Sequence, residues 1–92
     1  MSDPVELTLF VNGASEFSAR AIVDARRLCD DHLGPDCRLS IVDLHSDPDA
    51  GRPGAVVVTP TLVRTRPLPE RTIVGDISDS AKSLLALELA GG

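Results

Sequence analysis

A proline at the entrance of an apolar segment constrains the fold of this chain more than any other residue. Pro60 follows the apolar run 55–58 and stands in the tetrapeptide Thr59-Pro60-Thr61-Leu62. Proline cannot donate a hydrogen bond to a neighbouring strand, so it belongs at the first residue or the edge of a strand. An X-Pro bond also adopts the cis form at a cost of only about 0.5–1 kcal/mol. We therefore expect a strand to begin directly after Pro60, and we treat Pro60 as a candidate cis-proline.

The first half of the chain has the pattern of a β-α-β unit. Apolar residues alternate with other residues from Val5 to Val11, which predicts a strand. We expect a helix over 16–33, because apolar residues recur there at three- and four-residue spacing and Ser15 can cap its start. A second strand is expected over 38–44. The pattern predicts that the two strands run parallel and are joined by the helix.

The second half predicts a hairpin and a final helix. Strands are expected over 61–65 and 71–74, joined by the proline-containing turn 66–70. Ser78 with Asp79 can start a C-terminal helix. The expected apolar stripe of this helix comprises Ala81, Leu85 and Leu89, with Leu84 beside it.

The last apolar segment also fits a strand. Leu85, Leu87 and Leu89 alternate with other residues, which satisfies the strand pattern as well as the helical one. The high helix propensity of Ala, Leu, Glu and Lys favours a helix here.

This order of elements is typical of a thioredoxin-like fold. We expect an α/β protein with a βαβ(α)ββα arrangement and a mixed four-stranded sheet, in which residues 45–54 are irregular or form a short helix. In that fold the proline loop faces the turn between the first strand and the first helix, where redox enzymes hold their cysteines. The corresponding turn here, 11–17, contains no cysteine. The chain therefore has the frame of a redox protein without thiols at that position.

Composition excludes several classes of partner. The 92 residues suffice for one domain, and the net charge of −5 argues against binding to nucleic acid or to anionic lipid. The two aromatic residues are phenylalanines, so stacking on nucleic-acid bases is disfavoured. No apolar stretch approaches the roughly 20 residues that cross a membrane, and the N-terminus lacks the pattern of a signal peptide. We expect a cytoplasmic protein.

The two cysteines leave a choice open. Cys29 and Cys37 could form a disulfide across the Gly34-Pro35 step, but the absence of a secretion signal favours free thiols. We expect Cys29 to face the core from a helix and Cys37 to begin a strand. A thioredoxin-like redox or sensor module that uses either thiol stays as an alternative function.

No other side chains are spaced for catalysis or for metal binding. His32 and His45 are far apart in the sequence, and no paired His, Cys or carboxylate spacing is typical of a metal site. Asp43, Asp47 and Asp49 could hold a cation, but a solvated loop is the favoured interpretation. We expect no enzymatic activity, no metal and no cofactor.

Several short motifs, in their order and spacing, resemble the KaiB family along nearly the whole chain. The family's opening strand and turn, its helix start, its Thr-Pro-Thr-Leu segment and its Gly-Asp-Leu-Ser step all have counterparts. The matching residues are Leu9-Phe10-Val11-Asn12-Gly13, Ser18-Ala19-Arg20-Ala21, Thr59 to Leu62 with Arg64, Pro67 with Pro69 and Arg71, and Gly75-Asp76-Ile77-Ser78.

The resemblance implies a single KaiB-like domain over residues 1–92 that is noncatalytic and binds a hexameric KaiC-like ATPase. It implies a role in circadian rhythm or in clock-related stress signalling. The family is known in two folds, one thioredoxin-like and competent for KaiC, the other a ground state with a rearranged C-terminal half that forms a tetramer. A homodimer or a homotetramer is therefore left open.

Three arginines are the candidate partner-binding residues. Arg20, Arg64 and Arg71 match basic positions of the family and stand in an acidic chain. Arginine pairs with carboxylates through two parallel hydrogen bonds and is enriched at interface hot spots. We expect these arginines to contact an acidic rim of a KaiC-type ATPase, with Phe10 in the core and Pro60 shaping its loop.

Overall fold

The alternation of apolar and polar residues near the N-terminus produces the central strand of a sheet, β1 (Val5–Val11). Leu7, Leu9 and Val11 are buried on one face of it, and the residues between them are half-buried on the other. The computed structural model describes residues 4–47, 49 and 60–89 of the chain. The other described elements are α1 (Glu16–Arg27), η1 (Leu28–Leu33), η2 (Gly34–Asp36), β2 (Cys37–Asp43), β3 (Thr61–Arg66), β4 (Arg71–Val74) and α2 (Ser80–Ala86).

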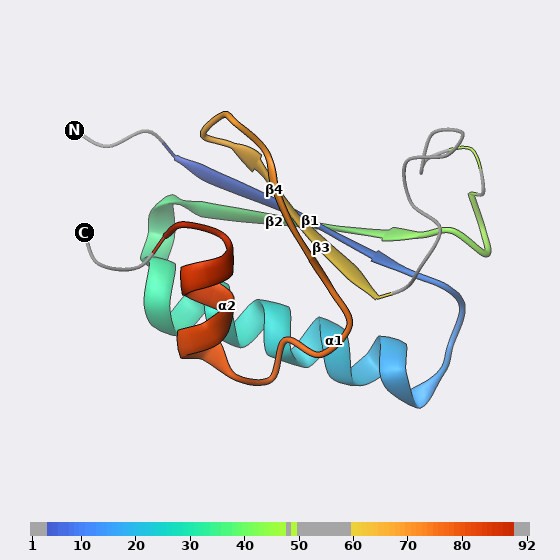
Figure 1. Cartoon of the computed structure of the whole chain (residues 1–92). Coiled ribbons are helices and arrows are strands. Elements are labelled where there is room, and N and C mark those ends of the chain that lie inside the picture. The colour runs from blue at the N-terminus through green and yellow to red at the C-terminus, as the bar shows by residue number, and fades with distance from the viewer. Residues whose placement is uncertain (1–3, 48, 50–59, 90–92) are drawn as a thin grey trace.

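The strands form one mixed sheet in the order β2-β1-β3-β4, and α1 and α2 lie on the same face of it (Figure 1). β2 runs parallel to β1, whereas β3 pairs antiparallel with β1 and β4 antiparallel with β3. Leu9 lies at the centre, with Ile41 of β2 and Leu62 of β3 as its register partners. The expected α/β class, the parallel first pair and the four-stranded mixed sheet are confirmed.

The long helix expected over 16–33 changes its winding before it ends. Ser15 caps α1 as expected, because its hydroxyl accepts a hydrogen bond from the Ser18 amide at 3.0 Å. After Arg27 the chain continues as a π-helix, η1, and then as a 3₁₀ turn, η2. Gly34, the first residue of η2, has a φ of 73°, a conformation that glycine adopts without steric cost.

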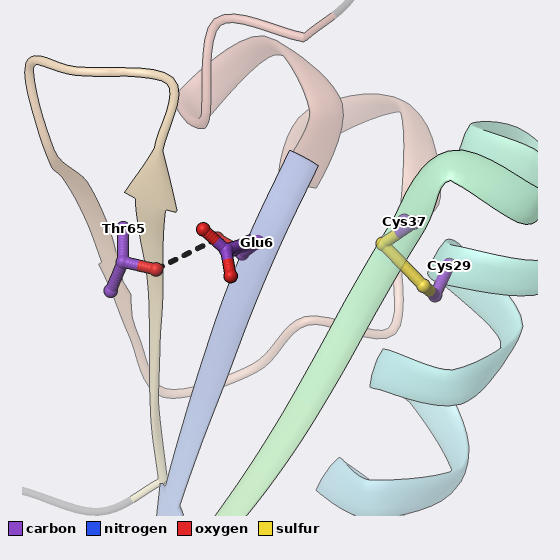
Figure 2. The surroundings of a disulfide bond; sticks show 4 residues. All are labelled: Glu6, Cys29, Cys37 and Thr65. Atoms are coloured by element: carbon purple, nitrogen blue, oxygen red, sulfur yellow. Dashed lines mark hydrogen bonds between the residues drawn. A yellow bond between two sulfur atoms is a disulfide. The ribbon is translucent and has the colours of Figure 1, made fainter. Parts of the chain in front are cut away.

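The disulfide between Cys29 and Cys37 corrects the expectation of free thiols. The two turns η1 and η2 bring the chain back on itself, so the Cα atoms of the two cysteines lie 5.7 Å apart (Figure 2). This distance falls in the usual range for a disulfide. Cys29 lies on a helical turn and is buried, and Cys37 is the first residue of β2, both as expected.

The core lies between the sheet and the two helices. Its members share almost complete burial and come from every layer of the fold: Leu7, Leu9, Val11, Ala21, Ala25, Leu28, Leu62, Ile77 and Leu87. Alanines on α1 allow the helix to approach the sheet closely.

Two expectations about burial were wrong. Phe10 is half-buried and lies outside the core cluster, because it alternates with Leu9 and so points to the face of the sheet that α1 does not cover. On α2 the expected stripe is also wrong, since Ala81 is exposed and Leu85 is 67% exposed.

The buried face of α2 is turned away from that expected stripe because the helix is fixed at both ends. The core residues Ile77 and Leu87 lie just before and just after it. Ser83 is buried between them, and its hydroxyl donates to the Ile77 carbonyl at 3.4 Å. Leu84 and Leu89 pack against the core as expected.

The cis form expected at Pro60 concerns the Thr59–Pro60 peptide bond, which lies outside the described residues. Most of the irregular segment expected over 45–54 also lies outside them. Within the described chain, the peptide bonds before Pro67 and Pro69 are cis. β3 begins at Thr61, directly after Pro60, as expected.

Candidate partner-binding surface

A pocket of about 360 Å³ opens between the start of α1, Pro60 and the segment after β4. We call it the α1 groove. Its walls combine apolar and charged side chains, and it is lined by Phe17, Arg20, Ala21, Asp24, Pro60, Gly75, Asp76 and Ile77. The groove lies where the proline loop of a thioredoxin-like fold meets the first helix.

A backbone contact fixes the side of the α1 groove that faces the helix. The Gly75 amide donates to the Pro60 carbonyl at 2.9 Å, which fixes the end of β4 against the start of β3. Gly75 has a φ of 95°, a conformation that residues with a side chain rarely adopt. The chain therefore turns directly from β4 into the wall formed by Asp76 and Ile77.

A carboxylate at the end of β2 fixes the turn that leads into α1. Asp43 Oδ1 accepts hydrogen bonds from the Gly13 and His45 amides, both at 2.9 Å. These two amides, with smaller help from the charge of His45 and the hydroxyl of Ser46, lower the pKa of Asp43. Since its carboxylate binds backbone amides, Asp43 has a structural role here. Within the described ranges no group of three or more His, Cys, Asp or Glu residues could hold a metal ion.

Phe17 is the most exposed large apolar side chain of the groove. It is 78% exposed in the first turn of α1, whereas the other groove residues of apolar type, Ala21 and Ile77, are buried. A single exposed apolar residue is common on protein surfaces, so Phe17 is of interest because it lines the α1 groove together with Arg20. Sequence reasoning missed Phe17, although an aromatic residue two positions after a capping serine was the available signal.

Charges of both signs surround the apolar part of the groove. Asp76 accepts a hydrogen bond from the Ser78 amide at 2.8 Å. The Ser78 hydroxyl and amide lower the pKa of Asp76, and the charges of Arg20 and Lys82 add to this effect. Asp24 is nearly buried, and its carboxylate lies 3.9 Å from Arg27. The groove therefore presents one cation, Arg20, beside two carboxylates.

Arg64 is inside the molecule, with 4% of its surface exposed. Its Nη1 donates to the Leu87 carbonyl at 2.6 Å and more weakly to that of Glu88, and its Nη2 donates to the Pro69 carbonyl at 2.6 Å. These bonds connect β3 to the end of α2 and to the β3–β4 turn. In this conformation Arg64 offers no surface to a partner, so its burial counts against the direct contact expected from the sequence.

Arg71 lies beside Arg64 but is accessible. The two residues are register partners on β4 and β3. The Arg71 side chain is 41% exposed; its Nε donates to Glu88 Oε2, and its Nη1 donates to the Glu70 carbonyl at 3.2 Å. The structure thus brings Arg64 and Arg71 together near the end of α2 and places Arg20 separately in the α1 groove.

The sequence comparison decides the family. Residues 8–89 match the family model described as the KaiB domain. The chain belongs to the KaiB family. A Synechocystis protein named circadian clock protein KaiB3 is 34% identical over 85 residues, which cover 92% of this chain and 83% of that protein. The circadian clock oscillator protein KaiB of Synechococcus elongatus is 33% identical over 86 residues, covering 94% of this chain and 84% of the relative.

Structural neighbours confirm the thioredoxin-like fold class. The N-terminal domain of Synechococcus elongatus SasA superposes with a TM-score of 0.74 at 21% identity, covering all of this chain and 90% of that domain. A yeast mitochondrial 1-Cys peroxiredoxin structure gives a TM-score of 0.71 at 17% identity, covering 95% of this chain and 79% of that one. These identities are low, so the likeness concerns the fold. No helix of the described residues has the length and apolar character needed to span a membrane.

Proposed function

We propose that this KaiB-family protein is a noncatalytic adaptor that binds a KaiC-type ATPase and modulates its state in a circadian clock or in clock-related signalling. The observation that carries the proposal is the match of residues 8–89 to the KaiB domain, together with relatives that are named circadian clock proteins. The thioredoxin-like arrangement supports it further, because this is the form that the family resemblance associates with KaiC.

The thiol-free turn before α1 supports a binding role rather than a redox reaction at that place. Where a redox enzyme of this fold holds its cysteines, this chain has Ser15 as a helix cap and Phe17 as an exposed ring. Its two cysteines are joined to each other after the end of α1. Phenylalanine and arginine are both enriched at protein–protein interfaces.

We assign the partner contact to Phe17 and Arg20 in the α1 groove, with Arg71 as a second contact. Arg20 and Arg71 are accessible enough to pair with carboxylates of an acidic partner surface. Arg64 supports this surface from inside, since it holds the segment that ends at Glu88, the partner of Arg71. The resemblance to KaiB leaves a homodimer and a homotetramer open for the free protein. The experiment below measures its oligomeric state together with binding.

The test is co-elution with a KaiC-type ATPase in the presence of ATP, with light scattering to give the mass of each species. The unmodified protein should shift into the ATPase fraction. Phe17→Ala and Arg20→Glu should each weaken binding about tenfold or more, because they remove a hot-spot ring or invert a charge.

Leu85→Ala is the matched control. Leu85 is 67% exposed on α2, away from the α1 groove, so its truncation should leave binding unchanged. Unchanged elution of the unmodified protein at tens of micromolar would count against the whole proposal. Equal losses for Phe17→Ala and Leu85→Ala would reject the α1 groove as the contact surface.

A further inference from the structure

The disulfide between Cys29 and Cys37 lies at the opposite end of α1 from the α1 groove. About 20 Å of helix separates Phe17 from Cys29. The bond joins η1 to the first residue of β2, and Figure 2 shows it at the start of that strand. Neither cysteine lines the α1 groove, so the chemistry of this bond does not depend on the function proposed above.

We propose that Cys29 and Cys37 form a reversible thiol–disulfide site, on which this protein is the substrate of an external dithiol reductant. The closed form fastens the end of the α1–η1 helix to β2. The open form releases that connection and lowers the stability of the domain while leaving its fold. Thus the redox chemistry of this chain acts on its own stability.

The two cysteine residues differ in exposure, which favours one of them as the site that a reductant attacks. Cys29 is 5% exposed and is preceded by Leu28, which is fully buried in the core. Cys37 is only half-buried and begins β2, which is an edge strand of the described sheet. An incoming thiolate therefore reaches the sulfur of Cys37, and Cys29 is the leaving group.

The exchange consists of two displacement steps. A thiolate of the reductant forms a bond to Cys37 Sγ while the Cys29–Cys37 bond breaks, and Cys29 leaves as a thiolate that takes up a proton. The second thiol of the reductant, once deprotonated, then attacks the sulfur that the reductant contributed to the mixed disulfide. This step releases Cys37, which also takes up a proton. Two electrons pass from the dithiol to the protein, and the reductant becomes a disulfide.

The segment closed by the bond is mostly at the surface, and only Leu33 within it packs against the core. Most of its residues are exposed, and its backbone changes from a π-helical to a 3₁₀ turn at Gly34. Asp30 and Asp36, which are exposed, adjoin the two cysteines in the sequence, and Asp31 lies between them. Arg38, which is also exposed, adjoins Cys37 on its other side, so three carboxylates stand against one arginine in this stretch. The net negative charge disfavours anionic thiols and favours a reductant with a neutral or basic face.

The first measurement is reduction of the folded, oxidised protein by dithiothreitol, followed by alkylation and intact mass. We expect two alkyl groups per chain at a temperature well below Tm and complete return to the disulfide upon oxidation. Closing a loop of this length stabilises a small domain enough that Tm should fall by roughly 10 °C on reduction. Reduction only above Tm, or an unchanged Tm, would overturn the proposal.

The Cys29→Ser/Cys37→Ser variant is the control for the thermal effect. It should have the Tm of the reduced protein and should not respond to dithiothreitol. If this variant does not fold, the reduced and alkylated unmodified protein provides the same comparison, and its circular dichroism spectrum should remain that of the oxidised form. Loss of the fold in that alkylated form would contradict a reversible site.

The attacked sulfur is identified with a monothiol, which cannot complete the second step. Rapid quenching with a maleimide should block Cys29 and leave the monothiol on Cys37, as read by peptide mapping. Cysteamine, a cation, should react several times faster than 3-mercaptopropionate, an anion, at equal thiolate concentration and low salt. A monothiol on Cys29 would reject the assignment of Cys37, and equal rates would reject the selection by charge.

Discussion

The two halves of the molecule are held together by different forces. The first half, β1 to β2, is fixed by apolar packing of β1 against α1 and by the Cys29–Cys37 bond. In the second half, β3 to α2, Leu62 and Leu87 also join the core, but the connection between the hairpin and α2 depends on Arg64. Both halves therefore contribute apolar residues to the core, but the first half adds a covalent bond to this packing and the second adds directed hydrogen bonds from a buried arginine.

This difference has a physical consequence for how each half responds to change. Apolar contacts are non-directional, and their stabilisation varies smoothly with buried area. Hydrogen bonds from a buried arginine need their acceptors in place, and a buried carbonyl left without a donor costs about 1–3 kcal/mol. The second half should therefore lose its structure more abruptly when a single polar contact is removed. The predictions below test this contrast in order of decreasing effect.

Removal of the Arg64 guanidinium should have the largest effect. Arg64→Met fills similar space but leaves the carbonyls of Leu87 and Pro69 without their donor, so the free energy of unfolding should fall by about 2–4 kcal/mol. Hydrogen exchange should show the loss in the amides of Leu87 and Leu89, while the amides of β1 keep their protection. Lysine lacks the planar fork that lets Arg64 bond both carbonyls. The free energy of unfolding of Arg64→Lys should therefore lie between those of the unmodified protein and of Arg64→Met. If the amides of both halves lost protection from hydrogen exchange equally, the two halves would not differ in their response to the loss of a polar contact.

The helix caps offer a matched pair of substitutions, one in each half. Ser15 caps α1 and Asp79 caps α2, each accepting from the amide three residues later at 3.0 and 3.1 Å. Ser15→Ala and Asp79→Ala should each cost about 1 kcal/mol in urea unfolding. Amide hydrogen exchange near the substituted cap should increase only in α2, because Ala21 and Ala25 also anchor α1 in the core. Ser80→Ala, one residue after the cap, is the control and should change neither quantity.

Exposed ion pairs should contribute little in either half. Arg71 and Glu88 pair in the second half with side chains 41% and 56% exposed. In the first half only Arg27 of the Asp24–Arg27 pair is exposed, and the two charged groups lie 3.9 Å apart. Double-mutant cycles with Arg71→Gln and Glu88→Gln should give a coupling below about 1 kcal/mol that declines in high salt. A larger coupling energy would mean that the Arg71–Glu88 pair stabilises the second half about as much as the hydrogen bonds of Arg64 do.

Two aspartates give a matched pH test, with the smallest expected effect. The pKa values of Asp43 in the first half and Asp76 in the second are both lowered in the folded protein. Each carboxylate therefore adds stability above its unfolded pKa of about 3.9, and this stability is lost as the pH falls through the lower folded value. Asp43→Asn and Asp76→Asn should each make unfolding less dependent on pH below about 4. An unchanged acid slope would show that the carboxylate contributes nothing there.

The sequence predicted most of the fold because the relevant signals are local. The alternation in β1, the Ser15 cap and the strand start after Pro60 each depend on neighbouring residues, and the structure has all three. The motifs that resemble KaiB are equally local, and the family comparison confirms them. Of the candidate site, the sequence pointed to Arg20 and to the turn before α1 but missed Phe17.

What the sequence could not supply are relations between residues far apart along the chain. The sequence predicts Arg64 to be a surface cation. In the structure, the end of α2 and the β3–β4 turn provide carbonyl groups that allow its burial. The face of α2 that packs inward is set by the anchors Ile77 and Leu87 rather than by the best apolar stripe.

The sequence alone thus determined the elements of this protein, their order and its family, because those follow from short-range spacing and from motifs. Only the tertiary structure decided that Cys29 meets Cys37 and that Arg64 lies inside. It also decided that Phe17 and Arg20 share a groove with Pro60. The physical reason is that helices and strands depend on local backbone preferences, whereas pairings and burial depend on how the packed elements bring distant residues together.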